Sequence, residues 1–184
     1  MNYNLFETNK TKIIVAILLI VFGVLMRLIP HMWNFTPIVA ISLFAGVHLG
    51  KKFIAPIIIV MMLVSDFVIG FYSLPVMISV YGSFMLIGVL SYLIKKDYHV
   101  VTIASTSIVS SIIFYIITNF AVWKFGSMYS QTIDGLMLSY TMGLPFLRNM
   151  LFGDLIFCAI LFGVYEFAIL FAKIYHQRKL RIVK

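Results

Sequence analysis

Long uninterrupted apolar runs most constrain the fold of this 184-residue chain. They cover residues 12–29, 34–50, 53–72, 76–94, 100–122 and 149–172. An apolar helix needs about 20 residues, at 1.5 Å each, to cross a hydrocarbon core about 30 Å thick. The runs do not alternate polar and apolar residues, as strands of a membrane barrel do. We therefore expect an all-α membrane protein with six transmembrane helices in a single integral membrane domain, residues 1–184.

Two segments fit this scheme less simply. The second run contains an apolar stretch of only 14 residues, 37–50, about 21 Å of helix, which is too short to span alone. Residues 133–146 are also apolar but are interrupted by Pro145. We interpret them as a short outer helix or re-entrant segment between the fifth and sixth spans, because a full crossing would carry the basic tail outward.

The basic residues predict the orientation of the spans. Cytoplasmic loops of membrane proteins carry an excess of lysine and arginine. With both termini inside, 11 of the 14 basic residues lie on the inner side and only Arg27, Lys124 and Arg148 lie outside. The inner set is Lys10, Lys12, Lys51, Lys52, Lys95, Lys96, Lys173, Arg178, Lys179, Arg181 and Lys184. We therefore expect cytoplasmic N- and C-termini.

With this topology, polar and aromatic residues from several segments gather at the outer level of the membrane. Charged groups at bilayer depth are costly unless they are paired or solvated, so they commonly mark functional sites. Planar aromatic and amide groups beside a guanidinium are typical of a small-molecule pocket. The candidate ligand-binding residues are Arg27, Asn34, Asp66, Asn119, Trp123, Tyr140, Arg148, Asn149 and Asp154.

Other interpretations of this outer cluster stay open. Arg27 and Arg148 could balance Asp66 and Asp154 as structural ion pairs that fix the helices together. Asp66 could also act in a proton or cation relay. Trp33 fits the interfacial belt of aromatic residues that many membrane proteins carry.

Small residues indicate close helix packing in the second run. Gly46 and Gly50 form a GxxxG pair, with Ser42 one turn earlier. Glycines at this spacing let helix backbones approach closely in a membrane. The hydroxyl residues of the fifth run are expected to pack and to bond within their own helix.

The sequence argues against catalysis and against metal or cofactor binding. The histidines His31, His48, His99 and His176 show no HExxH spacing, which a zinc site of that class requires. The single cysteine, Cys158, is expected to be a packing residue. No GxSxG motif is present. The basic inner face is explained by topology and contact with anionic lipid or by a cytoplasmic protein partner, and we expect no nucleic-acid partner.

Four segments carry a resemblance to known proteins: RLIPHMWNFTPIVAISLFAG (27–46), SDFVIGFY (65–72), TNFAVW (118–123) and GLMLSYTMGLPFLRNMLFGD (135–154). They resemble an uncharacterised family of bacterial membrane proteins with a supposed transport role. That family is similar to the substrate-binding S components of energy-coupling-factor (ECF) vitamin transporters. The resemblance implies a six-helix S-component-like bundle in the bacterial cytoplasmic membrane. It also implies an outward-facing pocket and a transmembrane coupling subunit with ATPases.

The chain departs from the S-component pattern in its first span. S components typically present an AxxxA surface there, whereas Ala16 is followed at the fourth position by Ile20. The N-terminus also lacks the second-position histidine of nickel and cobalt relatives. We expect binding or uptake of a vitamin-like or heterocyclic small molecule. The alternative is a structural or assembly subunit of a membrane or cell-envelope complex, whose outer charges would pair off completely.

Overall fold

The computed structural model describes residues 5–6, 8–94 and 98–182, with side chains described as far as residue 175. Every regular element in these ranges is a helix. In chain order they are α1 (Asn9–Leu28), α2 (Ile38–Phe44), the π-helical η1 (Ala45–Leu49), α3 (Lys51–Ile69), α4 (Leu74–Tyr92), α5 (Val100–Phe125) and α6 (Ile133–Ile182). The all-α prediction is confirmed for the described residues.

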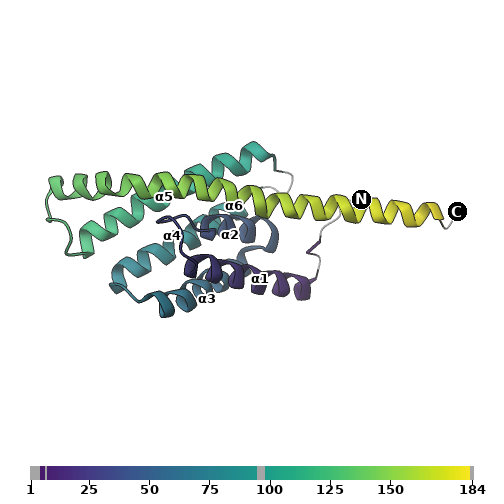
Figure 1. Cartoon of the computed structure of the whole chain (residues 1–184), viewed down its shortest axis with the longest axis horizontal. Coiled ribbons are helices and arrows are strands. Elements are labelled where there is room, and N and C mark those ends of the chain that lie inside the picture. The colour runs from purple at the N-terminus through teal and green to yellow at the C-terminus, as the bar shows by residue number, and fades with distance from the viewer. Residues whose placement is uncertain (1–4, 7, 95–97, 183–184) are drawn as a thin grey trace.

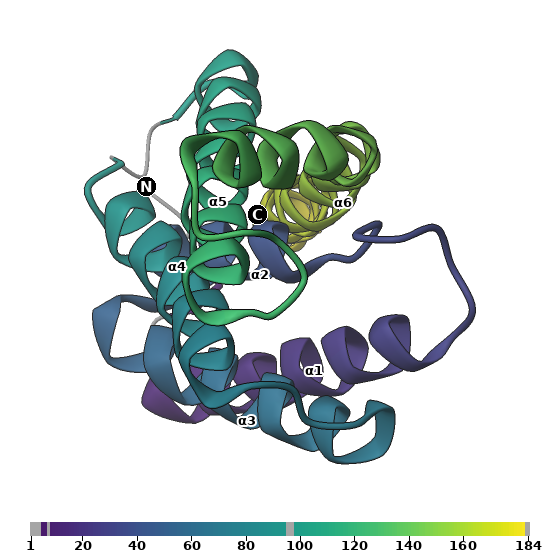
Figure 2. The same ribbon diagram turned by 90° about the vertical axis from the view of Figure 1, so that its left-hand side faces the viewer.

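Five of the described helices, α1, α3, α4, α5 and α6, are long and apolar enough to cross a membrane. The expected sixth span, residues 34–50, corresponds to α2 and η1, which together cover only Ile38–Leu49. The structure thus supports five spans by length, and the sixth stays a prediction. Every residue of Ile38–Leu49 is buried, and Figure 2 shows α2 near the centre of the bundle. A helix enclosed by protein does not need the length that contact with lipid would demand.

Two glycines shape this central segment in different ways. A Cβ at Gly46 would lie 1.9 Å from Ser91 Oγ and 2.3 Å from the Gly88 carbonyl oxygen, so η1 packs directly on α4. Gly50 instead has φ +95° and open space around it, which allows the turn into α3. Of the expected GxxxG pair, only Gly46 therefore makes a close helix contact, whereas Gly50 forms a turn.

α6 is a single helix of 50 residues with Pro145 inside it. The predicted break before residue 149 is therefore wrong, since residues 133–146 are continuous with the last span. Figure 2 shows the first part of α6 (green) crossing the end of the bundle, while the remainder is seen end-on. Proline lacks a backbone N–H and crowds the preceding turn, which bends a helix without requiring it to stop.

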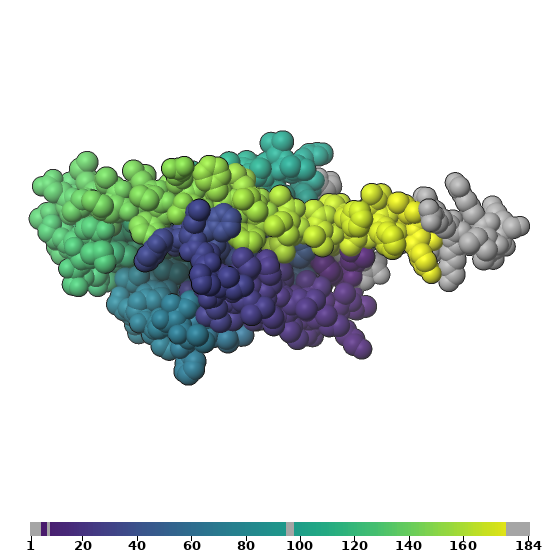
Figure 3. Space-filling model, in the orientation of Figure 1, coloured from purple at the N-terminus to yellow at the C-terminus, as the bar shows by residue number. Residues whose placement is uncertain are grey.

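The bundle has two distinct ends (Figure 1). The connections 29–37, 70–73 and 126–132 lie at one end, which we call the loop end. α1 begins and α6 finishes at the other end, the terminal end, where the last part of α6 (yellow) extends beyond the other helices (Figures 1 and 3).

The basic side chains follow this division. Lys10 and Lys12 lie in the first turn of α1 and Lys51 and Lys52 in that of α3, at the terminal end. The predicted inner-side residues Lys95, Lys96 and Lys184 lie outside the described residues, as do the side chains of Arg178, Lys179 and Arg181.

Candidate ligand-binding site

A charged pair joins α1 to α3 near the loop end. Arg27 Nη2 lies 2.6 Å from Asp66 Oδ1, and the Asp66 side chain is only 1% exposed. The other carboxylate oxygen, Oδ2, accepts a hydrogen bond of 2.6 Å from the Tyr81 hydroxyl of α4. Arg27 Nη1 donates to the Ser65 hydroxyl and to the Met62 carbonyl. Both oxygens of the buried carboxylate thus have a hydrogen-bond partner, and three helices are joined at this point.

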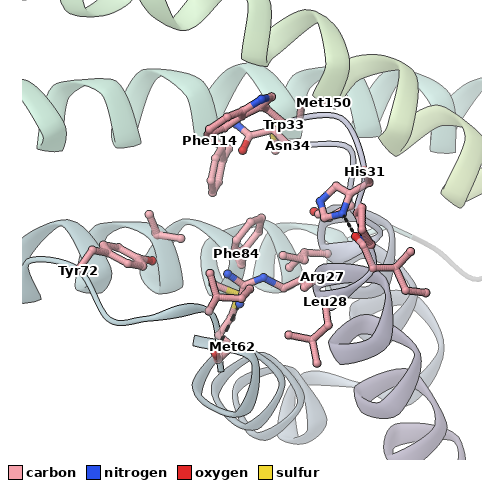
Figure 4. A pocket seen from close by; sticks show the side chains of 16 residues that line it. Arg27, Leu28, His31, Trp33, Asn34, Met62, Tyr72, Phe84, Phe114 and Met150 are labelled. Carbon is pink, nitrogen blue, oxygen red and sulfur yellow. Dashed lines mark hydrogen bonds between the residues drawn. The ribbon is translucent and has the colours of Figure 1, made fainter. Parts of the chain in front are cut away.

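The Arg27 side chain, 14% exposed, forms part of the wall of a cavity of about 490 Å³ at the loop end. Figure 4 shows Arg27, Asn34, Tyr72 and Phe84 around it, each supplied by a different element. Ligand pockets commonly measure about 300–1,000 Å³. The lining residues are Arg27, Leu28, Ile29, Pro30, His31, Trp33, Asn34, Thr36, Ile38, Met62, Ile69, Tyr72, Val80, Phe84, Phe114 and Met150.

A second cavity of about 300 Å³ lies between α4, α5 and the first part of α6. It contains Asn119 of α5 and Gly143 of α6, where an added Cβ would lie 2.5 Å from Asn119 Oδ1. The Asn119 amide nitrogen donates to the Tyr115 carbonyl. Both cavities share four lining residues, so they adjoin: Asn34, Val80, Phe114 and Met150.

The connection 29–37 covers one side of the larger cavity. Asn34 has φ +60°, a left-handed conformation that asparagine tolerates better than most residues. The neighbouring Trp33 ring packs edge-on against Phe146 at a centroid distance of 5.8 Å. Asn149 Nδ2 of α6 donates to the Trp33 carbonyl at 3.2 Å. These contacts hold the connection against α6.

Aromatic groups form the remaining walls. Phe84 of α4 and Phe114 of α5 stack with ring centroids 4.5 Å apart and an interplanar angle of 26°. Tyr72, in the connection 70–73, turns toward the cavity in Figure 4. Desolvation by burial, followed by the Asp66 charge, raises the pKa of Tyr72 to about 12. Its hydroxyl is neutral at physiological pH, as for an ordinary tyrosine, and can donate a hydrogen bond.

The nine predicted site residues have different surroundings. Arg27, Asn34 and Asn119 line the cavities, and Asp66 lies behind Arg27. Trp123 Nε1 donates to the Ser130 carbonyl at 2.9 Å, and the Tyr140 hydroxyl donates to the Ile116 carbonyl at 2.9 Å. The first bond holds the connection 126–132 against α5, and the second joins α6 to α5.

The remaining pair, Arg148 and Asp154, does not form the charge balance considered above. Arg148 is exposed, whereas Asp154 is 1% exposed and accepts a hydrogen bond from Ser111. The two residues are six positions apart on α6, which places them on different faces of a helix with 3.6 residues per turn. The ion pair found among the described residues is Arg27–Asp66.

Several lining residues were not predicted from the sequence. Met62, Phe84, Phe114 and Met150 belong to long apolar runs, where a cavity-lining side chain looks the same as a packing side chain. Tyr81, which bonds to Asp66, was not predicted either. The one sequence signal was that a tyrosine buried inside an apolar helix usually finds a hydrogen-bond partner.

Comparison with known proteins gives one match. The sequence model described as "Family of unknown function (DUF6580)" matches residues 7–178 of the chain. No curated protein and no solved structure matches, so the comparisons establish no link to ECF S components.

Proposed function

Because the chain belongs to the DUF6580 family, whose function is unknown, we propose a function from the site itself. The protein is a membrane protein that binds a small molecule in the two adjoining cavities at its loop end. The observation that carries this proposal is the cavity of about 490 Å³, whose wall includes a guanidinium fixed by a buried carboxylate. Polar groups placed in this way orient a ligand within a mostly apolar pocket.

The lining favours a ligand that is neutral and planar. The charge of Arg27 is already balanced by Asp66 at 2.6 Å, so the pair adds no net charge to the cavity. Asn34 and Tyr72 supply further hydrogen-bonding groups, and Phe84 and Phe114 supply aromatic surface. A heterocycle with donors and acceptors on its rim matches this arrangement, and it is the class of ligand that we propose.

The orientation in the membrane is part of the proposal. Lysines at the starts of α1 and α3 support a cytoplasmic terminal end, following the excess of basic residues on cytoplasmic sides. The loop end and its cavities then face outward from a bacterial cytoplasmic membrane. In this account the protein is not an enzyme and uses no metal or cofactor.

Uptake of the bound molecule is a further step of the proposal, supported by the resemblance to S components. In that scheme a transmembrane coupling subunit with ATPases would contact the bundle. α1 offers an apolar surface, since Ile13, Ile17 and Val21 are about half exposed. Ala16, in contrast, is 7% exposed and packs inside the bundle. Coupling would therefore use a surface other than an alanine pair on α1.

The binding proposal can be tested by filling the cavity. Val80 lines both cavities, and Val80→Phe places a ring there. Val89→Phe is the matched control, because Val89 lies on the same helix, is 51% exposed and lines neither cavity. Gently purified wild type and Val89→Phe should release the same small molecule in native mass spectrometry with extraction, and Val80→Phe should release much less. Equal recovery from all three proteins would refute the proposal.

One observation favours a second candidate, a structural or assembly subunit. α6 has 50 residues, about 75 Å at 1.5 Å per residue, and its last part extends beyond the other helices (Figure 1). Such a projecting helix could hold a partner protein at the cytoplasmic face. An empty wild-type cavity, together with stable co-purification of other membrane proteins, would support this candidate.

A further inference from the structure

Asp154 differs from Asp66 in lacking a cationic partner. Its side chain is 1% exposed, and its Oδ2 accepts a hydrogen bond of 2.6 Å from Ser111 of α5. No ion pair of the described residues includes it. It lines neither cavity at the loop end, so the proposed ligand site does not explain it.

Along α6, Asp154 lies between two hollow regions of the protein. Met150, one turn before it, lines both cavities at the loop end. Cys158, one turn after it, lines a groove of about 370 Å³ between α5 and α6 that reaches Glu166 and Tyr98. Residues four apart share one face of a helix. Asp154 therefore lies between the loop-end cavities and the groove.

The side of α5 that faces α6 shows the same order of cavity, Asp154 contact and groove. Phe114 lines the loop-end cavities, Ser111 bonds to Asp154, and Ile103 lines the groove. Between them lies Ser107, whose buried hydroxyl has no nitrogen or oxygen partner among the described residues. Its neighbour is the thiol of Cys158. The α5–α6 interface thus has a polar centre of one carboxyl group, two hydroxyl groups and a thiol.

The helices packed around Asp154 supply no opposing charge. α2, which contacts both α5 and α6, has Ser42 as its one polar residue. On α5 the titratable groups are Tyr115, which bonds to the Tyr140 carbonyl, and Lys124 in the last turn. Cys158 is the titratable neighbour on α6. The charged residues nearest in sequence on α6 are exposed Arg148 and exposed Glu166.

We propose that Asp154 is a proton-binding site within the membrane: it carries a proton at neutral pH and exchanges it along the α5–α6 interface. An isolated carboxylate in a low-dielectric interior is so unfavourable that the group is neutralised instead. The Ser111 hydroxyl has one proton and two acceptors within reach, Asp154 Oδ2 at 2.6 Å and the Ser107 carbonyl at 3.0 Å. A proton on Asp154 can therefore be shared with Ser111 across the shorter contact. The routes to solvent that the proposal requires are the loop-end cavities and the groove, which lie one helical turn to either side of Asp154. This site does not depend on ligand binding at the loop end.

Infrared spectroscopy of the reconstituted protein, with isotope-labelled aspartate, tests the proposal. At pH 7 the wild type should show the C=O band of a protonated carboxyl group, and this band should shift after transfer to D₂O. Asp154→Asn should lose the band, whereas Asp134→Asn, at an exposed position of the same helix, should retain it. Ser111→Ala removes the hydrogen bond to Oδ2 and should move the band to higher frequency without abolishing it.

The opposite results would overturn the proposal. A wild type without the band, or with a carboxylate signal that responds to Na⁺, would show that Asp154 is ionised. A band that persists in Asp154→Asn would belong to another carboxyl group. A band that never shifts in D₂O would exclude proton exchange. If Asp154→Asn does not fold, the frequency shift in Ser111→Ala decides the assignment, and an unshifted band there would refute it.

Discussion

Arg27 Nη2 and Asp66 Oδ1 lie 2.6 Å apart and connect the last turn of α1 to α3. The pair is fixed on both sides, since Tyr81 binds the carboxylate and Ser65 accepts from the guanidinium. It therefore has two roles in our account. It holds α1, α3 and α4 together, and it presents a neutralised guanidinium to the cavity.

Removal of one partner should destabilise the protein strongly. Arg27→Ala or Asp66→Ala leaves the other charge buried, and such losses cost about 3–5 kcal/mol. The double variant Arg27→Met with Asp66→Leu should recover much of this loss, because no unpaired charge remains. Denaturant unfolding in detergent measures the difference. Equal destabilisation by the single and double variants would contradict a direct pairing.

The Tyr81 hydroxyl should contribute through its bond to Asp66. A hydrogen bond to a charged group is worth about 1.5–3 kcal/mol, and Tyr81→Phe removes this one with little change in shape. We expect a lower unfolding free energy by that amount in the wild-type background. In an Asp66→Asn background the same substitution should have a much smaller effect, and an unchanged effect would show that Tyr81 acts through other contacts.

Gly46 should not tolerate a side chain. Its Cβ would lie 1.9 Å from Ser91 Oγ and 2.3 Å from the Gly88 carbonyl oxygen, and overpacking of this kind costs about 1–3 kcal/mol. Gly82 on α4 has open space around it, so Gly82→Ala should be neutral or stabilising by up to about 1 kcal/mol. Thermal unfolding of Gly46→Ala and Gly82→Ala compares the two positions directly.

Cysteine labelling tests the orientation. In a Cys158→Ala background, Thr36→Cys places a thiol in the loop-end cavity, and Lys52→Cys places one at the terminal end, where Lys52 is exposed. A membrane-impermeant maleimide added to intact cells should label Thr36→Cys, and Lys52→Cys should react only after the membrane is permeabilised. The reverse pattern would place the cavities on the cytoplasmic side.

Much of the fold was predictable because lipid imposes a length on each span. The runs that became α1, α3, α4 and α5 were found to within a few residues. α2 is shorter than the run expected over residues 34–50, because burial in protein removes that length requirement, and a sequence does not show which run is enclosed. The helix break predicted at Pro145 was wrong for a different reason: a helix can bend at proline and continue.

Charged residues within apolar runs were the clearest signal for the candidate site. Arg27 and Asp66 were predicted on this basis and were found to form a pair. The suggested charge balance that included Arg148 and Asp154 was not found, because pairing depends on which helix faces point at each other. Phe84 and Phe114 were not predicted, since an aromatic residue in a membrane span gives no signal that distinguishes a cavity wall from a packing contact.

We propose that the loop-end cavity holds a small molecule in the cell. A photoreactive phenylalanine analogue at Trp33 tests it directly, with Phe67 as the matched control. Trp33 is 76% exposed and lines the cavity, whereas Phe67 is 77% exposed and does not. After illumination of living cells, mass spectrometry should find one discrete small-molecule adduct at position 33 and lipid adducts at position 67. Lipid adducts alone at both positions would contradict the account.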